Sequence, residues 1–464
     1  MKILLVQPNA SETIVGFGSM AQTEPLALEI IAASVPEHEV KILDLRFDPS
    51  LDSTISSFGP RLVGITGYTP DVPMMLDICQ RVKSQDRDIM TVVGGYHATL
   101  CPQDFDRDFV DAIVMGEGET TFRELADAVE RGRDLGEIEG IAYRESGKQV
   151  TNPQREMATS LNSLPLPSRH LVDHYREQYH LHFWESPYSI ETSRGCPYRC
   201  YFCAVWRFHR GKCRFRSPEL ALEDVRRARS RNILFVDDNF LQDVRRAERM
   251  YELIRAEGME NEYWIQARSD SIVKRPDLIE KWASIGLKTV LIGLEKASDE
   301  ELTSIDKRTS VKTNERAMEI MRENGVDIWG AFIVDPQWTR SDFDALIDYV
   351  LRMEITIPQF TVLTPIPGTA FFQEKHEEIT THNYQVFDFL HSVLPTKLPI
   401  EEFYSNMARL YSSTTMGWRE LMRRVRSGEI SPQSLKRLKE ILGELTNPQA
   451  YLRDSQIAWE HLHG

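Results

Sequence analysis

Short apolar runs alternate with stretches of helical periodicity along the first 150 residues. Runs of this length between turn residues are typical of buried strands, and their alternation with helices predicts right-handed crossovers and a parallel, doubly wound sheet. The predicted strands are residues 3–7, 40–45, 62–66, 90–93 and 112–115. The predicted helices are residues 25–33, 73–83 and 121–131. Ligands of such sheets bind at the carboxyl ends of the strands.

A second series of strand and helix patterns follows a boundary marked by prolines at residues 164–169. Six strand–helix units predict an incomplete β/α barrel, whose catalytic groups would gather at the carboxyl ends of its strands. The predicted strands are residues 188–192, 232–236, 263–267, 289–294, 328–334 and 360–363, with helices such as 276–283 and 311–323. The fold class is therefore α/β throughout, with a helical C-terminal region.

The expected domains are a sheet domain (1–150), a linker (151–187), a partial barrel (188–370) and a helical C-terminal domain (371–464). A hairpin pattern at 139–149 has Ser146 and Gly147 at its turn. Ser431 and Pro432 begin an amphipathic helix, and Ser217 with Pro218 begins another. The basic segment 418–426 is open to two interpretations, a contact with an anionic membrane or lipid-like substrate, and a solvated helix packed on the barrel.

The composition is that of an ordinary globular protein, with 41% apolar and 27% charged residues among 464. A net charge of −15 argues against a nucleic-acid partner, because phosphate binding needs a basic surface. No signal peptide and no run of about 18 apolar residues is apparent, so we expect a cytoplasmic protein. Six cysteines in so long a chain do not form a disulfide framework, and Cys79 and Cys101 are expected to be inert.

Three of the cysteines are clustered: Cys196, Cys200 and Cys203 have the spacing C-x3-C-x2-C. Thiolates on a short loop are the ligands of iron–sulfur clusters, and three of them leave one iron open to another ligand. The alternatives are a zinc knuckle, with His209 or Cys213 as fourth ligand, and a disulfide staple. The strand pattern before the motif and the repeating units after it favour the cluster.

With Phe202 just before the last cysteine, this motif resembles that of the radical S-adenosylmethionine superfamily. The resemblance implies a [4Fe-4S] cluster whose open iron binds the amino and carboxylate groups of S-adenosylmethionine, and reductive cleavage to a 5'-deoxyadenosyl radical. It also implies that residues at the strand ends contact S-adenosylmethionine, although ordinary caps and salt bridges are the alternative for each. These residues are Asp237 and Asp238 for the amino group or ribose, Gln266 and Arg268 for the carboxylate, Glu295 for ribose or carboxylate, and Phe332 beside the adenine.

Glycines and small polar residues also follow three strands of the first domain, at 67–71, 94–99 and 116–120. A sheet domain placed before such a barrel resembles the cobalamin-binding domain of the B12-dependent branch of the superfamily. The resemblance places the corrin edge and the nucleotide tail of cobalamin against Gly94, Gly95, His97, Thr99, Gly116, Glu117 and Gly118. The D-x-H-x-x-G motif is absent, which implies base-off cobalamin with Tyr68 or Thr69 below the cobalt. The alternative is a degenerate domain whose glycines only form tight turns.

The resemblance implies a methyltransferase that methylates an unactivated carbon of a small-molecule, lipid or tetrapyrrole-like substrate, by way of the 5'-deoxyadenosyl radical and methylcobalamin. It further implies an external electron donor such as flavodoxin or ferredoxin. One alternative is a cobalamin-dependent rearrangement or oxidative cyclisation without net methyl transfer. Another is a non-catalytic iron–sulfur or corrinoid-binding sensor.

Overall fold

The computed structural model describes residues 1–9 and 20–460, and these form two compact units. Unit 1 contains the described residues 1–9 and 24–176, and unit 2 contains residues 20–23 and 177–460. The division falls within a run of 3-10 turns, η5 (Arg169–Gln178). It is coarser than the four expected segments, because residues 152–176 pack with unit 1 and the C-terminal helices pack with the barrel strands.

Unit 1 is built on a seven-stranded sheet with the order β3-β1-β4-β5-β6-β7-β8. Its strands are β1 (Lys2–Gln7), β3 (Glu39–Asp44), β4 (Leu62–Thr66), β5 (Met90–Gly94), β6 (Ala112–Val114), β7 (Ile141–Glu145) and β8 (Lys148–Thr151). The first five strands in this order are parallel, which confirms the predicted sheet. The expected hairpin forms as β7 and β8, and it adds two antiparallel strands to the edge of the sheet.

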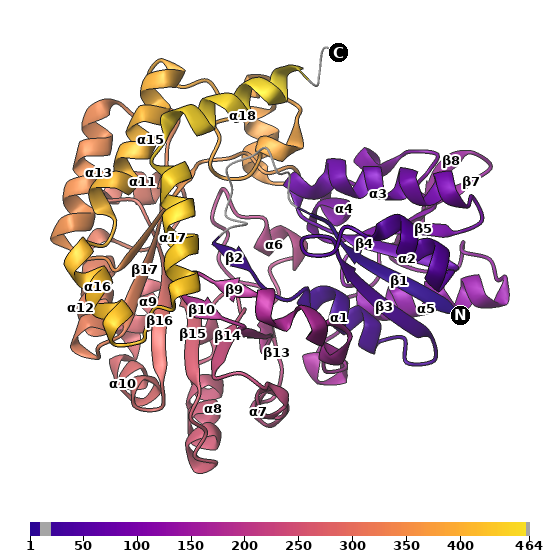
Figure 1. Cartoon of the computed structure of the whole chain (residues 1–464), viewed down its shortest axis with the longest axis horizontal. Helices are drawn as coiled ribbons and strands as arrows, with labels where there is room; N and C mark the ends of the chain where they lie inside the picture. Colours follow the sequence, from indigo (N-terminus) through magenta and orange to yellow (C-terminus); the bar gives the residue numbers. More distant parts are fainter. Residues whose placement is uncertain (10–19, 461–464) are drawn as a thin grey trace. The chain divides into compact units, whose positions relative to one another are not determined.

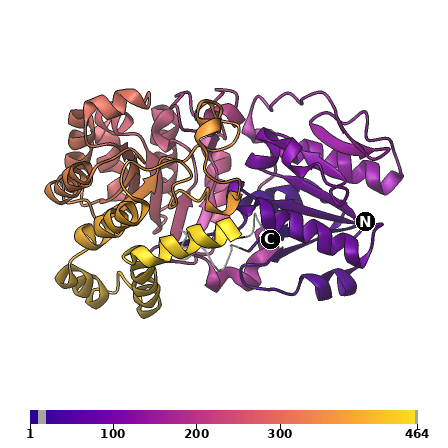
Figure 2. The ribbon, with the colours of Figure 1, turned by 90° about the horizontal axis from the view of Figure 1, so that it is seen from above.

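Helices cover both faces of this sheet (Figure 1, Figure 2). They are α1 (Leu26–Ala33), α2 (Leu51–Phe58), α3 (Val72–Gln85), α4 (Tyr96–Leu100) and α5 (Gly118–Arg131). Helices α1 and α5 pack together on one face, and α2 and α3 pack together on the other. Burial on both faces explains why strands such as β1 are continuous apolar runs and do not alternate. Helix α2 was not predicted, since it is short and rich in serine.

Unit 2 contains six parallel strands in sequential order, β11-β14-β15-β16-β17-β18. Their bounds are β11 (Tyr188–Ile190), β14 (Asn232–Phe235), β15 (Glu262–Ala267), β16 (Leu287–Glu295), β17 (Asp327–Val334) and β18 (Ile357–Val362). All six predicted strands are therefore present, and their order is that of an incomplete β/α barrel. Helices follow the strands and lie on the outer side of the sheet (Figure 1). They are α7 (Pro218–Arg227), α8 (Val244–Ala256), α9 (Ser269–Lys274), α10 (Pro276–Ser284), α11 (Asp299–Ser304), α12 (Val311–Glu323), α13 (Arg340–Arg352) and α14 (Ala370–Lys375).

Four further helices, α15 (Ile400–Thr414), α16 (Trp418–Arg426), α17 (Pro432–Leu445) and α18 (Pro448–Glu460), complete unit 2. Helix α15 packs on α13 and β18, and the Tyr411 hydroxyl donates a hydrogen bond to the carbonyl of Phe360 at 2.8 Å. Ser431 caps α17 as predicted, by accepting from the Ser434 amide. The basic segment is a helix whose Arg424 donates to both carboxylate oxygens of Asp327, at 2.6 and 2.7 Å. None of the helices in the described part of the chain is long and apolar enough to cross a membrane.

Candidate cofactor-binding site

The three clustered cysteines lie on one loop of unit 2, after β12 (Ser193–Arg194) and before α6 (Val205–Phe208). Strand β12 pairs with β13 (Arg214–Phe215), and this short ladder closes the base of the loop. None of the three thiols is in a disulfide, and Cys200 is buried. The disulfide alternative is therefore not realised in this structure.

Burial is the main cause that raises the pKa of Cys196, and it raises the pKa of Cys203 to about 12. The Cys200 thiol adds to the raised pKa of both. All three sulfurs are on the one loop between β12 and α6. Thiolates at this site therefore need a neighbouring cation. Three grouped sulfur ligands on a braced loop fit the donor set of an iron–sulfur cluster with one open iron.

The two candidate fourth ligands for zinc have other contacts. The ring Nδ1 of His209 lies 3.0 Å from an Nη of Arg214, and His209 is buried. The Cys213 thiol donates to the carbonyl of Gly195 at 3.5 Å. These contacts favour a site of three sulfurs over a closed zinc site.

Gly195 is required by the path of the loop directly before Cys196. Its φ is +91°, and a Cβ built on it would lie 2.1 Å from the carbonyl oxygen of Lys212. Only glycine combines a positive φ with this close approach of two backbone segments. The motif therefore depends on Gly195 as much as on its cysteines.

Asp237 braces the lead-in to this loop from the end of β14. One of its carboxylate oxygens accepts from the amides of Thr192 and Ser193, at 2.7 and 2.9 Å. The other accepts from the Thr192 hydroxyl and, at 3.2 Å, from Arg246 of α8. Because Asp237 is fully buried with both oxygens occupied, we assign it this bracing role in place of the contact with S-adenosylmethionine expected from the sequence.

Asp238, the next residue, is placed differently. It accepts a hydrogen bond from the amide of Gly195 at 2.8 Å, and burial raises its pKa to about 6. It is also close enough to Cys196 and Cys203 to raise their pKa values. Of the two aspartates, Asp238 is the one that lies at the thiol site.

Arg268, at the end of β15, clamps the cysteine loop. Its guanidinium lies 3.6 Å from the ring centroid of Tyr198, donates to Asp270 at 3.0 Å and donates to the Lys307 carbonyl at 2.6 Å. Asp270 also accepts from the Tyr198 hydroxyl at 2.7 Å. Cation–π stacking on Tyr198 and the hydrogen bond from Tyr198 to Asp270 thus hold the loop against the barrel, whereas the sequence suggested that Arg268 clamps the carboxylate of a ligand.

Glu295, at the end of β16, is in a buried ion pair with Lys307 at 2.5 Å. Its φ of +62° is unusual for a residue other than glycine, and β16 and β17 shift register between Gly293 and Glu295. Such strain often accompanies functional positions. The carboxylate nevertheless has a protein partner, so a ligand would have to share it with Lys307.

Gln266 and Phe332 lie on opposite sides of the sheet. Gln266 shares a face of β15 with Trp264, away from Tyr263, whose ring packs towards the helix layer against Trp282 at 5.5 Å. Among the described residues, none hydrogen-bonds the side chain of half-buried Gln266, so its amide is available to a ligand. Phe332 is fully buried on the helix side, so it cannot lie beside an adenine within the barrel as expected.

The ring of Phe332 stacks with Phe360 and meets Tyr349 of α13 edge-on, at centroid distances of 5.9 and 6.1 Å. Phe202 of the cysteine loop instead packs, with Tyr201, against an apolar cluster near the ends of β17 and β18. This cluster consists of Ile333, Leu363, Phe371 and Leu394. Phe202 therefore anchors the loop to the barrel rim.

In unit 1, the three glycine-containing loops meet at the carboxyl ends of β4, β5 and β6. The Thr99 hydroxyl donates to the Gly95 carbonyl at 2.7 Å and accepts from the Gly116 amide at 2.9 Å. Gly95 has a φ of +101°, and a Cβ there would lie 2.8 Å from the Gly67 carbonyl. Gly94 ends β5, Glu117 is the N-cap residue of α5, and Gly118 is its first residue. The structure thus brings the predicted loop residues together at one sheet edge.

Tyr68 and Thr69 point to different environments. Tyr68 is 67% exposed and lies near Tyr96, with ring centroids 6.0 Å apart. Thr69 is buried, and its hydroxyl lies 3.1 Å from Nδ1 of His97. Of these two residues, Tyr68 is therefore the one that offers a surface to a ligand.

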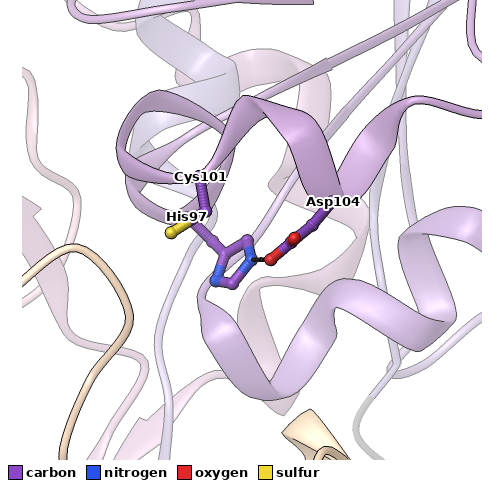
Figure 3. Close-up of side chains that lie close together, drawn as sticks. All are labelled: His97, Cys101 and Asp104. Carbon is purple, nitrogen blue, oxygen red and sulfur yellow. Dashed lines mark hydrogen bonds and ion pairs between the residues drawn. The ribbon is translucent and has the colours of Figure 1, made fainter. Parts of the chain in front are cut away.

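His97 is also buried, with Thr69 on one side of its ring and Asp104 on the other. Figure 3 shows the contact between His97 and Asp104. Its Nε2 lies 2.9 Å from the Asp104 carboxylate. Both ring nitrogens thus have protein partners. His97 supports the loops from within, and this corrects the expectation that it contacts cobalamin.

Sequence reasoning missed Tyr198, Asp270 and Lys307. The opposite charges of Arg268 and Asp270, two residues apart after a strand, were a local signal for an ion pair. Lys307 had no such signal, because its partner Glu295 is 12 residues away across a helix.

Comparisons with known proteins agree with this arrangement. Residues 190–350 match the family model of the radical SAM superfamily, and residues 13–126 match that of the B12 binding domain. The hopanoid C-3 methylase of Methylococcus capsulatus is 30% identical over 430 residues, covering 90% of this chain and 81% of that protein. The anaerobic magnesium-protoporphyrin IX monomethyl ester cyclase of Rubrivivax gelatinosus is 26% identical over 352 residues, and the alignment covers 73% of this chain and 63% of that protein.

A solved structure shares the fold. It is that of the radical S-adenosylmethionine methyltransferase TsrM from Kitasatospora setae, with cobalamin and a [4Fe-4S] cluster bound. The TM-score is 0.69 at 18% identity, and the alignment covers 89% of this chain and 90% of that chain.

Proposed function

Because the chain belongs to the cobalamin-dependent branch of the radical S-adenosylmethionine superfamily, we propose that it transfers a methyl group to an unactivated carbon of a small organic substrate. Its cofactors are a [4Fe-4S] cluster, S-adenosylmethionine and cobalamin. When bound, the cluster supplies the electron that cleaves S-adenosylmethionine, and cobalamin carries the methyl group.

The residues of unit 2 hold and orient the reacting groups. Cys196, Cys200 and Cys203 would hold the cluster, on a loop that Asp237 and Arg268 fix to the barrel. Fixing the loop in advance lowers the entropy cost of bringing the reactants together. Gln266 offers an amide within the barrel, and Glu295 offers a carboxylate at its rim, for the polar groups of S-adenosylmethionine.

The residues of unit 1 would hold cobalamin at the edge formed by the glycine loops. We propose base-off binding, since His97 has both nitrogens engaged inside the protein. Tyr68 would contact the corrin with its exposed ring.

One observation carries the proposal: three unpaired thiols lie on one braced loop, in a chain whose N-terminal region matches a B12 binding domain. The substrate class that we favour is a lipid or tetrapyrrole-like molecule, because a 30% identical relative is named as a hopanoid methylase. We also propose that a flavodoxin or ferredoxin in the cytoplasm delivers the electron, since the site needs reduced thiols.

The test is anaerobic reconstitution with iron, sulfide and hydroxocobalamin, followed by reaction with S-adenosylmethionine labelled on its methyl group. Candidate hopanoids and tetrapyrroles should gain the labelled methyl, and 5'-deoxyadenosine should form. C200S should abolish both, and the matched control C213S should retain the cluster. Iron-free C196S, C200S or C203S protein with full turnover would refute the proposal.

Oxidative cyclisation without methyl transfer is the second candidate, favoured by similarity to a protein named as a monomethyl ester cyclase. The same assay separates the two. Loss of hydrogen from the substrate without gain of label indicates cyclisation, and gain of label indicates methyl transfer.

A further inference from the structure

Outside the cysteine loop, unit 1 brings a histidine, a cysteine and a carboxylate together (Figure 3). One potential ligand atom from each of His97, Cys101 and Asp104 lies within 4.8 Å of the other two. The spacing H-x3-C-x2-D explains this proximity. His97 is in α4 and Cys101 is its C-cap residue, so four residues of helical spacing place them on one face. The 3-10 turn η3 (Pro102–Phe105) then returns Asp104 towards the imidazole.

The imidazole of His97 is oriented by a group outside this cluster. Its Nε2 lies 2.9 Å from the Asp104 carboxylate, and its Nδ1 lies 3.1 Å from the Thr69 hydroxyl, on the loop after β4. Histidines that bind metals usually donate their other ring N–H to an oxygen, which fixes the tautomer and the ring orientation. In this structure Nε2–H donates to the Asp104 carboxylate and Nδ1 accepts from the Thr69 hydroxyl; with an ion in place of the Nε2 proton, that proton would move to Nδ1 and be donated to Thr69.

The chemistry of this cluster suits zinc. Imidazole nitrogen, thiolate sulfur and carboxylate oxygen are the ligand types of Zn²⁺, and three protein ligands leave one position for water. A thiolate and a carboxylate together balance the two charges of the ion, so the filled site is neutral. Neutrality matters here because His97 and Cys101 are 2% and 5% exposed. The Asp104 side chain is 24% exposed and leaves a path for entry.

We propose that His97, Cys101 and Asp104 form a zinc site, with Thr69 as its orienting residue. Binding displaces the thiol proton of Cys101 to solvent, while the imidazole retains one proton on Nδ1. The ion joins α4 and η3, and through Thr69 it ties both to the loop after β4. It therefore has a structural role beneath the glycine loops, which is separate from the proposed methyl transfer.

The test uses the holoenzyme with its iron–sulfur cluster and cobalamin in place, dialysed against zinc and then against buffer. We expect about one zinc per chain by mass spectrometry, and X-ray absorption at the zinc edge should show one sulfur at about 2.3 Å with nitrogen or oxygen neighbours at about 2.0 Å. These readouts do not depend on turnover. Absence of zinc, or a shell of three sulfurs from the cysteine loop, would overturn the proposal.

Variants locate the ion. C101S and the isosteric D104N should each lose the zinc, and T69V should bind it roughly 10- to 100-fold more weakly. C79A is the matched control, because Cys79 is a buried thiol of the same unit outside the cluster, and its zinc content should not change. Retention of zinc by folded D104N and C101S would also overturn the assignment. Folding is checked by circular dichroism and by cobalamin binding.

Discussion

Replacing Asp237 with asparagine tests the brace beneath the cysteine loop. The change preserves shape and the acceptor for the amides of Thr192 and Ser193. It replaces the other oxygen by an NH₂ group, which then faces two donors, the Thr192 hydroxyl and the Arg246 guanidinium. Two hydrogen bonds are lost and a buried cation is left without its carboxylate.

The size of the effect follows from these contacts. Hydrogen bonds to charged groups contribute about 1.5–3 kcal/mol each. Removal of one partner of a buried ion pair costs about 3–5 kcal/mol. The two lost hydrogen bonds give about 3–6 kcal/mol, and the broken ion pair gives about 3–5 kcal/mol. We therefore expect D237N to lower the free energy of unfolding of unit 2 by about 3–5 kcal/mol. R246M should cost a similar amount, because it leaves the buried Asp237 carboxylate without its cation and removes the hydrogen bond of Arg246 to the Phe240 carbonyl. The two changes should be coupled by about 1.5 kcal/mol or more.

The assay is urea unfolding of D237N, R246M and the double variant, followed by tryptophan fluorescence, with iron content measured after anaerobic reconstitution. D243N is the matched control. Asp243 caps α8 through the amides of Arg245 and Arg246, where asparagine caps equally well, so its stability should change by less than about 0.5 kcal/mol. D237N, R246M and the double variant form a double-mutant cycle. The reasoning would be refuted if D237N lowered the free energy of unfolding by less than about 1 kcal/mol, or if the effects of the two single changes were additive in the double variant.

Three further predictions concern single positions. G195A should lower the iron content at least tenfold at unchanged cobalamin binding, because its Cβ would lie 2.1 Å from a backbone oxygen across the loop; normal iron loading would contradict the proposed loop path. G95A should weaken cobalamin binding at least tenfold in a spectroscopic titration with iron content unchanged, because its φ is +101°. Burial lowers the pKa of His391, but the carboxylates of Asp388 and Asp454 outweigh it and raise the pKa. The stabilisation is therefore complete below about pH 6.5, the ordinary pKa of histidine, and is lost as the pH rises through the raised folded pKa. The thermal midpoint should therefore fall as the pH is raised above about 6.5, and H391Q should flatten this slope.

The sequence by itself determined most of the elements, and it also predicted the cysteine ligands of the cluster. Continuous apolar runs and helical periods are local properties, so they located five strands of the first sheet and all six strands of the barrel. The three cysteines are close in the chain, and their spacing together with the strand–helix units around them indicated an iron–sulfur site. Glycines at strand ends marked the sheet edge, because parallel strands present their carboxyl ends together.

Only the tertiary structure decided which polar groups remain available to a ligand. Asp237 and His97 occupy the positions expected of ligand-binding residues, but donors and acceptors from distant segments engage them inside the protein. Phe332 shows the same limit, since alternation along a strand tells which residues share a face but not which face the helices cover. The pairing of Glu295 with Lys307 likewise depends on how a loop returns to the barrel. Contacts between residues far apart in the chain form only when the fold closes, so no local pattern reports them.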